Sequence, residues 1–247
     1  MSEYGTFSDD FYNTVSLKTE MPLPSSRESV MHFFEQLQKC YPELSNFYGR
    51  EPNEYVLEQD KEQGDYRWAS VEKNRISSGY VNPPTMEDAI QQHQLIFDSA
   101  PHLLSASKLD CELLTVMFGF DFTYRGNHHQ LLADVLGMPP VMERLAGIDQ
   151  SKMLSYEPML QIALDEDCRV QARISIDPRT NAYHVKTSEF PEEQLSVFLH
   201  LRRYGSIAAD ESFVSTIEML MNKGREILED HLIEHLLQPL QQHIAIK

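Results

Sequence analysis

Apolar residues recur every three or four positions in several segments, which is the pattern of helices with one buried face. Ser25 and Glu28 have the spacing of a capping box, so we expect the first helix to begin at Ser25. A second helix is predicted between Thr85, as its N-cap, and Pro101, beyond its end. The remaining predicted helices are residues 127–136, residues 140–145 and a long C-terminal helix over 210–237, ended by Pro239.

Alternation of apolar and polar residues indicates β-strands in other segments. Residues 109–122 carry the strongest pattern and are nearly apolar on both faces, which is typical of a central strand. Residues 191–204 fit the strand and helix periods about equally, and the unbroken alternation from Leu195 to Leu201 favours a strand. The other predicted strands are residues 54–59, 66–72, 75–81, 160–164, 170–176 and 183–187.

These elements predict the domain organisation. Residues 1–24 are polar and close with MPLPSS, so we expect a flexible N-terminal arm. Residues 25–247 are predicted to form a single α+β domain, with a split into two lobes near 126–150 as the alternative. An antiparallel meander sheet is covered on one face by helices, including the long C-terminal helix. This layout resembles that of helix-grip domains, which implies a site for apolar ligands, although no motif carries the resemblance.

The negative charge of the chain disfavours some classes of binding partner. A net charge of −17, from 38 acidic and 21 basic residues, disfavours binding to nucleic acid and to anionic membrane surfaces. The three cysteines form no CxxC pair, and the chain shows neither an apolar leader nor a membrane-spanning run. We therefore expect a cytoplasmic protein.

The stretch from Gly119 to Gly137 gathers polar residues where a strand passes into a helix. Neighbouring helical residues project about 100° apart, so His128 and His129 are poorly placed to hold one metal. Asn127 fits a helix N-cap, and a structural turn is the favoured interpretation. The alternative is a polar pocket in which His128 acts as general base beside Asp121 and Arg125.

A second candidate lies in the predicted C-terminal helix. His231 and His235 frame the sequence HLIEH, which matches the H-x-x-E-H pattern of zinc peptidases. The pattern needs a further acidic ligand downstream, and the 12 residues after His235 contain no acid. We therefore expect no metal or other cofactor.

A small basic strip is predicted on the outer face of the meander. Its members are Arg169, Arg173, Arg202 and Arg203. Such a strip suits an acidic partner or a carboxylate, and the alternative is a solvated surface with neighbouring acids.

The chain contains no Walker A, GxGxxG or GxSxG motif, so the first hypothesis is a non-enzymatic interaction protein. Its partner is another protein or a second copy, bound through the sheet edge or the C-terminal helix. The second hypothesis is a carrier of a small apolar ligand in a pocket between sheet and C-terminal helix. That pocket would be lined by Met117, Phe118, Phe120 and Met221. The third is a metal-assisted hydrolase that uses His231 and His235, or His128 and Asp134.

Overall fold

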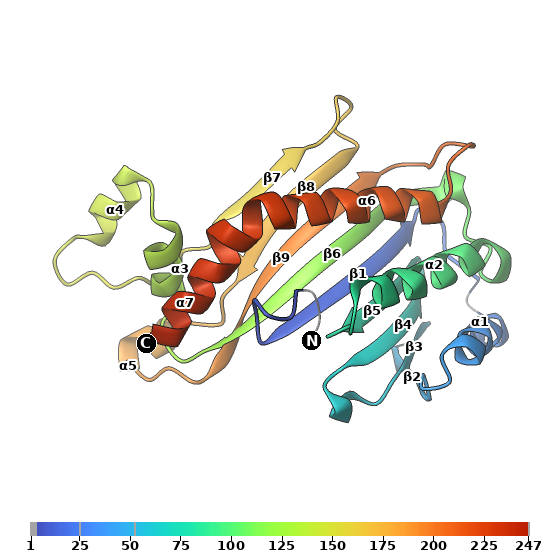
Figure 1. Cartoon of the computed structure of the whole chain (residues 1–247), viewed down its shortest axis with the longest axis horizontal. Coiled ribbons are helices and arrows are strands. Elements are labelled where there is room, and N and C mark those ends of the chain that lie inside the picture. The colour runs from blue at the N-terminus through green and yellow to red at the C-terminus, as the bar shows by residue number, and fades with distance from the viewer. Residues whose placement is uncertain (1–3, 25, 52, 247) are drawn as a thin grey trace.

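A computed structural model describes residues 4–24, 26–51 and 53–246 (Figure 1). Its strands are β1 (Asp10–Thr19), β2 (Asn46–Glu51), β3 (Glu54–Glu58), β4 (Tyr66–Glu72), β5 (Arg75–Val81), β6 (Cys111–Tyr124), β7 (Met159–Ala163), β8 (Val170–Asp177) and β9 (Glu193–Tyr204). Its α-helices are α1 (Arg27–Cys40), α2 (Met86–Leu103), α3 (His128–Leu136), α4 (Pro140–Ala146), α5 (Ala182–Thr187), α6 (Phe213–Ile227) and α7 (Gln238–Ile246). Two 3₁₀ turns, η1 (Lys61–Gln63) and η2 (Lys108–Asp110), and a π-helical segment, η3 (Leu228–Leu237), complete the described elements.

All nine strands form one antiparallel sheet in the order β2-β3-β4-β5-β1-β6-β9-β8-β7. The predicted α+β class, with helices on one face and a long C-terminal helix, is therefore confirmed. The order of elements repeats, because a strand, a helix, a group of strands and a covering helix occur twice. In each half the first strand, β1 or β6, lies at the middle of the sheet, and these two strands pair with each other.

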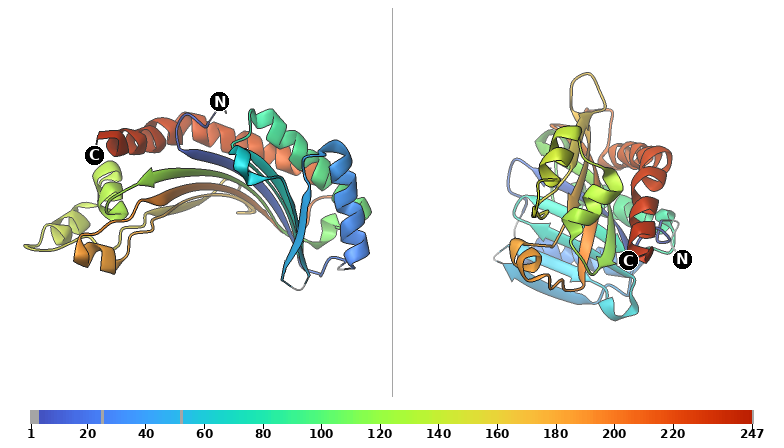
Figure 2. Two further views of the ribbon diagram at one scale, coloured as in Figure 1. Left: turned by 90° about the horizontal axis from the view of Figure 1, so that it is seen from below. Right: turned by 90° about the vertical axis from the view of Figure 1, so that its left-hand side faces the viewer.

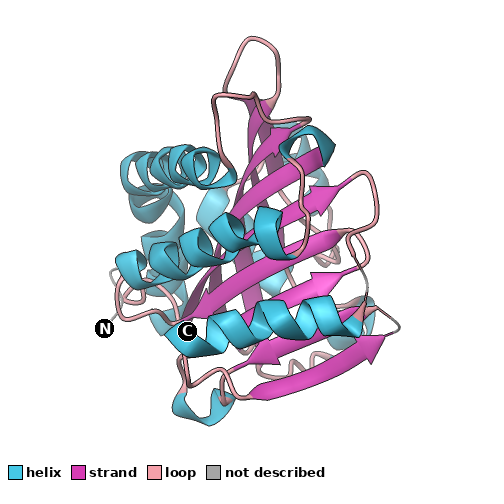
Figure 3. Cartoon of the chain, turned by 90° about the vertical axis from the view of Figure 1, so that its right-hand side faces the viewer, coloured by secondary structure: helices cyan, strands magenta, loops and turns pink. Residues whose placement is uncertain are grey.

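The helices α1, α2 and α6 cover one face of the sheet (Figure 3), and the core lies beneath them. The sheet is bent so that the helices lie on its convex side and the opposite face is concave (left view of Figure 2). No helix crosses this concave face within the described part of the chain. We call it the open face.

The N-terminal segment differs from the prediction. Residues 10–19, expected in a flexible arm, form the central strand β1, hydrogen-bonded on both edges. The strand was missed because its buried positions include two polar residues, Asn13 and Thr19. The Asn13 amide donates to the Met117 carbonyl (2.9 Å), and its side-chain oxygen contacts His93 Nε2 (3.0 Å). Hydrogen bonds inside the fold thus allow a polar residue at a buried position, where the prediction required an apolar one.

The predicted strand over 183–187 is wrong, since α5 forms there. The Asn181 side chain accepts from the backbone of Tyr183 and His184 and starts the helix. Strand β2 forms over Asn46–Glu51, where no strand is predicted. By contrast, the ambiguous segment at 191–204 contains strand β9, as expected.

Two prolines lie inside helices that they were expected to follow. Pro101 belongs to the last turn of α2. The C-terminal helix continues through Pro239, which occupies the first turn of α7, where a missing N–H is tolerated. The expected N-cap at Ser25 lies outside the described residues, and Ser26 caps α1 by accepting from Ser29 N.

Candidate binding face

The register of the central strands fixes which side chains share the open face. Residues directly opposite one another in neighbouring strands point to the same side of a sheet. One row across β4, β5, β1, β6 and β9 consists of Tyr66, Val81, Tyr12, Gly119 and Phe198. The next row, which extends into β8, consists of Trp68, Gly79, Thr14, Met117, His200 and Arg173.

A pocket of about 510 Å³ lies where these two rows cross the N-terminal strands. Three aromatic side chains line it, those of Tyr12, Tyr66 and Trp68, together with Met117 and Val81. Asp10, Thr14, Lys61, Gly64, Asp121 and Gln194 complete the lining. We call this site the aromatic pocket.

Two glycines keep the aromatic rings flat against the sheet. A Cβ at Gly79 would lie 2.3 Å from the Trp68 indole, and one at Gly119 would lie 2.3 Å from the Tyr12 ring. Both rings therefore lie over bare backbone of the neighbouring strand. The Trp68 indole N–H has no hydrogen-bond acceptor among the described residues, so it is available to a ligand.

One end of the aromatic pocket is acidic. Asp10 and Asp121 stand directly opposite each other in β1 and β6, an arrangement in which like charges repel. The Tyr12 hydroxyl donates to Asp121 (3.2 Å), and the Asn82 amide donates to Asp10 (2.7 Å). Burial raises the pKa of Asp121 and the charge of Asp10 raises it further, while hydrogen bonds from Ser196 and Tyr12 oppose the shift.

A resident cation already lies against one wall of this pocket. Lys61 Nζ is 5.3 Å from the centre of the Tyr66 ring and 3.1 Å from Glu58 Oε2. Aromatic faces attract cations, and carboxylates strengthen that attraction. The pocket therefore combines flat apolar walls with two carboxylates that face no lysine or arginine within ion-pair distance among the described residues.

The histidine pair at the start of α3 forms hydrogen bonds to neighbouring loops. The ring of His128 accepts from Arg179 N (3.1 Å) through Nδ1, and its Nε2 lies 3.4 Å from the Tyr124 carbonyl. The ring of His129 accepts from Tyr156 N (3.0 Å), and its Nε2 lies 3.1 Å from the Thr180 carbonyl. Both rings are buried and hold loops together, and burial lowers the pKa of His128.

The residues grouped with His128 in the sequence lie apart from it. Asp121 lines the aromatic pocket on the open face. Arg125 is exposed, donates to the Phe190 carbonyl (3.3 Å) and lines a separate pocket beside α5. No hydrogen bond or ion pair in the described structure joins any two of these three residues. The favoured interpretation as a strand-to-helix turn agrees with this geometry, since Asn127 caps α3.

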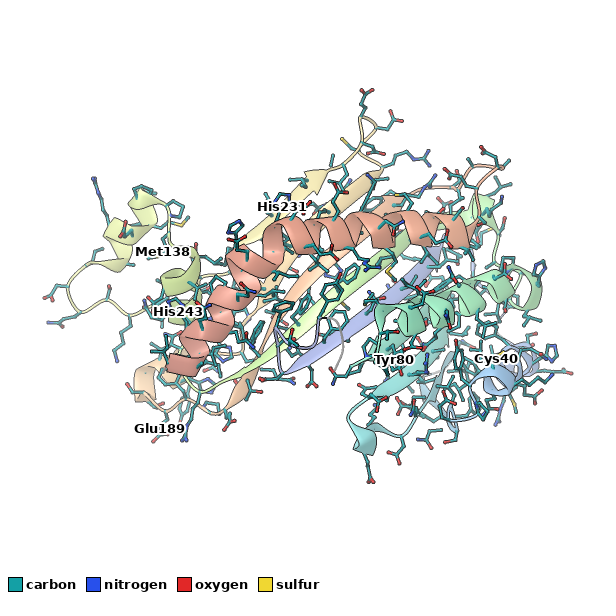
Figure 4. All side chains as sticks on the ribbon, in the orientation of Figure 1. Cys40, Tyr80, Met138, Glu189, His231 and His243 are labelled. Atoms are coloured by element: carbon teal, nitrogen blue, oxygen red, sulfur yellow. The ribbon has the colours of Figure 1, made fainter. Side chains whose placement is uncertain are left out.

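His231 (Figure 4) and His235 are both exposed and belong to the π-helical segment η3; the figure labels only His231. Within the described residues, no group of three or more His, Cys, Asp or Glu side chains could hold a metal ion. Asp134, the alternative partner of His128, accepts a hydrogen bond from Gln130 (2.8 Å).

The residues predicted to line an apolar pocket do not share one. Phe118, Phe120 and Met221 are fully buried between the sheet and α6, where a Cβ at Gly224 would lie 2.3 Å from the Phe118 ring. Met117 points to the opposite face and lines the aromatic pocket. Adjacent strand residues cannot point to the same side, which separates Met117 from Phe118.

Strand β7 forms an exposed edge at the far end of the sheet. All five of its residues are exposed, including Met159, Leu160 and Ile162. Leu164 N donates to the Val170 carbonyl (2.8 Å). Backbone groups alternate in direction along an antiparallel strand, so those of Leu160 and Ile162 also point towards β8. The backbone N–H and C=O groups of Met159, Gln161 and Ala163 therefore point outwards.

Comparison with protein-family models, with curated proteins and with solved structures finds no match to this chain. No described helix combines the length and apolar character needed to cross a membrane. The candidate site is thus defined by its own geometry.

The aromatic pocket was not found from the sequence. Tyr66 and Trp68 belong to the predicted strand over 66–72, which carries no binding role in the prediction, and Tyr12 falls in the predicted flexible arm. The available signal was the alternation of Tyr66 and Trp68 opposite a strand that contains Gly79, because bulky aromatic residues beside a strand glycine often cover it.

Proposed function

We propose that this chain is a non-enzymatic binding protein whose open face takes an organic cation in the aromatic pocket. The observation that carries the proposal is the aromatic pocket itself, with three aromatic walls and two carboxylates on a face that no described helix covers. A ligand of this class has a positive charge next to an apolar body. The charge would relieve the repulsion between Asp10 and Asp121, and the body would stack on Trp68 and Tyr12.

Trp68 is the single tryptophan of the chain, so intrinsic fluorescence reports directly on the aromatic pocket. We expect benzyltrimethylammonium to change this fluorescence saturably, and benzenesulfonate, an anion of similar size, to leave it unchanged. Asp121→Asn should weaken the cation about tenfold, the size of one lost charge interaction of about 1.4 kcal/mol. Glu87→Gln, an exposed charge change on α2, is the matched control. Equal binding of the two probes, or no effect of Asp121→Asn, would refute the cation site.

A second candidate function, self-association, is favoured by strand β7. Exposed apolar side chains gather on β7, on α4 and on the loop between them. They are Val141, Met142, Leu145, Ile148, Leu154, Met159, Leu160 and Ile162. Exposed apolar side chains on an unpaired edge strand, as on β7, are typical of an interaction site.

The edge of β7 is complementary to a second copy of itself. An antiparallel β7–β7 pair centred on Gln161 would join the outward backbone groups of Met159 and Gln161 to those of Ala163 and Gln161 in the other copy. The same register would place Leu160 of one copy beside Ile162 of the other. The strand carries no charge. Glu157 and Asp165 would face each other across this register, so added salt should strengthen the association.

Gln161→Pro tests this pairing, because it removes an N–H that points away from β8. Proline is tolerated on such an edge and blocks the addition of another strand. Sedimentation equilibrium should show a dimer for the parent chain and for Gln161→Ala, and a monomer for Gln161→Pro. A parent chain that is monomeric at high salt and high concentration would exclude the β7 dimer.

A further inference from the structure

Arg173 of β8 and Arg202 of β9 lie together on the open face. Arg173 stands directly opposite His200, and Arg202 lies two residues farther along β9 on the same face. Diagonal neighbours of this kind have Cβ atoms about 7–8 Å apart, which long side chains can span. The two guanidinium groups and the imidazole ring of His200 can therefore reach one small ligand.

These three side chains have no acceptor in the described structure. The Nε atoms of Arg173 and Arg202 are buried without a hydrogen-bond partner. Neither arginine forms an ion pair with a described residue, and the ring nitrogens of His200 have no hydrogen-bond partner there either. A buried donor of a charged group that lacks an acceptor is unfavourable, so this cluster favours a bound anion.

The other two arginines of the predicted basic strip behave differently. Arg203 donates to the carbonyls of Gly205 (2.6 Å) and Ser206 (2.7 Å), and its Nη2 lies 3.7 Å from Glu211. Arg169 donates to the carbonyl of Ser206 (2.9 Å). Both serve the chain itself. The protein has 38 acidic residues, yet Arg173 and Arg202 have no carboxylate or carbonyl partner in the described structure, which distinguishes them from Arg169 and Arg203.

We propose that Arg173, Arg202 and His200 form a binding site for a doubly charged oxyanion, such as a phosphate monoester or a dicarboxylate. The planar fork of each arginine matches two oxygens of such a group, and His200 adds a neutral donor. A turn of each guanidinium towards the ligand would satisfy its buried Nε–H.

The arginines of this site lie away from the carboxylates of the aromatic pocket, although Met117 of that pocket stands directly opposite His200. Arg202 stands opposite Thr115 in β6, and Asp121 lies six residues farther along that strand. At about 3.4 Å per residue, the two ends of the open face are about 20 Å apart. The Asp121→Asn variant should therefore leave the oxyanion site intact, so that failure of one site is distinguishable from failure of the other.

His200 supplies a spectroscopic readout of the site. Burial, together with the charges of Arg202 and Arg173, lowers the pKa of His200 to about 4. The neighbours that face it are Arg173 from β8, Met117 from β6, and Arg202 and Phe198 on its own strand. A bound dianion offsets the two positive charges, so it should raise the pKa of His200.

The test titrates the full chain at low ionic strength with inorganic phosphate and, separately, with succinate, by calorimetry and by NMR of the histidine rings. We expect at least one probe to bind and to raise the pKa of His200 by about one unit. Arg173→Gln and Arg202→Gln should each weaken that probe at least tenfold, while Arg144→Gln, an exposed arginine on α4, should not. Arg202→Lys should fall between these limits, because it keeps the charge and loses the fork.

Each outcome decides the proposal. Binding of phosphate alone supports a phosphoryl ligand, and binding of succinate alone supports a dicarboxylate. Equal weakening by Arg144→Gln would show general attraction to positive charge and would overturn the site. A His200 pKa that stays constant at saturating probe, or no binding of either probe by a folded chain, would overturn it as well.

Discussion

The two halves of the sheet follow one plan but leave different surfaces. In the N-terminal half, α1 covers the outer strands, and Phe34 of this helix packs edge-on against Phe47 of β2. In the C-terminal half, Leu160 and Ile162 of β7 point to the helical side and remain 57% and 45% exposed. The outer strands are therefore covered by a helix at one end of the sheet, while the apolar side chains of β7 stay exposed at the other.

Ion pairs occur in both halves, as between Arg179 and Asp177 (3.0 Å), but one pair of arginines in the C-terminal half forms none with a described residue. Lys18, Lys61 and Arg75 of the N-terminal half each lie within 3.9 Å of a carboxylate. Arg173 and Arg202 of the C-terminal half pair with no described acid. Polar groups that the chain does not satisfy itself are available to a ligand, so the C-terminal half adds a second candidate surface to the aromatic pocket of the N-terminal strands.

The edge strands repeat this contrast. Strand β2 has a register shift between Gly49 and Glu51 and carries the charges of Arg50 and Glu51. Bulges and charges of this kind block pairing with another chain. Strand β7, with the sequence MLQIA, has neither.

The largest expected effect compares matched positions of the two halves. Leu57 of β3 and Ile162 of β7 both lie three strands from the middle of the sheet, on its helical side. Leu57 is 1% exposed, so Leu57→Ala should reduce the free energy of unfolding by about 3 kcal/mol. Ile162→Ala should cost less than about 1 kcal/mol in the monomer, because half of that side chain is already in water. Urea denaturation measures both, and equal losses would contradict the open C-terminal half.

Arg67 is a buried cation of the N-terminal half. Its removal should reduce the free energy of unfolding almost as much as Leu57→Ala. Its guanidinium lies 4.0 Å from the centre of the Tyr80 ring and donates to Gln92 (3.0 Å). We expect Arg67→Ala to lower the free energy of unfolding by about 3 kcal/mol, since it strips several buried partners at once. Arg173→Ala should change it by less than about 0.5 kcal/mol. Similar losses for the two variants in urea would argue that Arg173 is structural.

A substitution at Gly224 probes the contact between α6 and the sheet. A Cβ there would lie 2.3 Å from the Phe118 ring and 3.0 Å from Leu201. We expect Gly224→Ala to cost about 2 kcal/mol through overpacking, which outweighs the gain of about 1 kcal/mol in helix propensity. Asn222→Ala, at an exposed site on the same helix, is the control. A stabilised Gly224→Ala protein in thermal unfolding would indicate a looser interface.

The pH dependence of stability is the most specific prediction, because it depends on a single side chain. Burial lowers the pKa of His93 to about 3, and the charge of Arg67 contributes to the shift. The unfolded chain therefore binds one more proton than the folded chain between about pH 6.5 and pH 3. Stability from this group is complete above pH 6.5 and falls by about 1.4 kcal/mol per pH unit below it. Urea denaturation at several pH values gives the slope of the free energy of unfolding against pH. Below pH 6.5 this slope should be smaller for His93→Gln by the contribution of one proton, and identical slopes would contradict a neutral His93.

Local patterns predicted much of the fold. The bounds of β4 and β5 match the predicted strands, and Asn127 and Thr85 cap the helices that they were expected to begin. The patterns failed at β1, where Asn13 is buried because it has hydrogen-bond partners inside the fold. They also failed at residues 183–187, where the Asn181 cap starts a helix instead of the predicted strand. Alternation also places Arg202 and Arg203 on opposite faces, although the predicted basic strip contained both.

The candidate sites were less accessible to prediction. Which face of a strand stays uncovered depends on where the helices lie, and no single strand encodes this. Tyr12 and Trp68 come together only because β1 and β4 both flank β5. That neighbourhood follows from the order of strands in the sheet, which the sequence pattern does not specify.

The central position of β1 has a consequence for how the chain folds during synthesis. One edge of β1 pairs with β5, which follows within the same half, but the other pairs with β6, where Asp10 lies opposite Asp121. Until the ribosome has released β6, that second edge presents unpaired backbone and offers a template for wrong pairing. Nascent chains that stop before residue 111 should therefore depend on chaperones, and that dependence should fall once β6 has emerged.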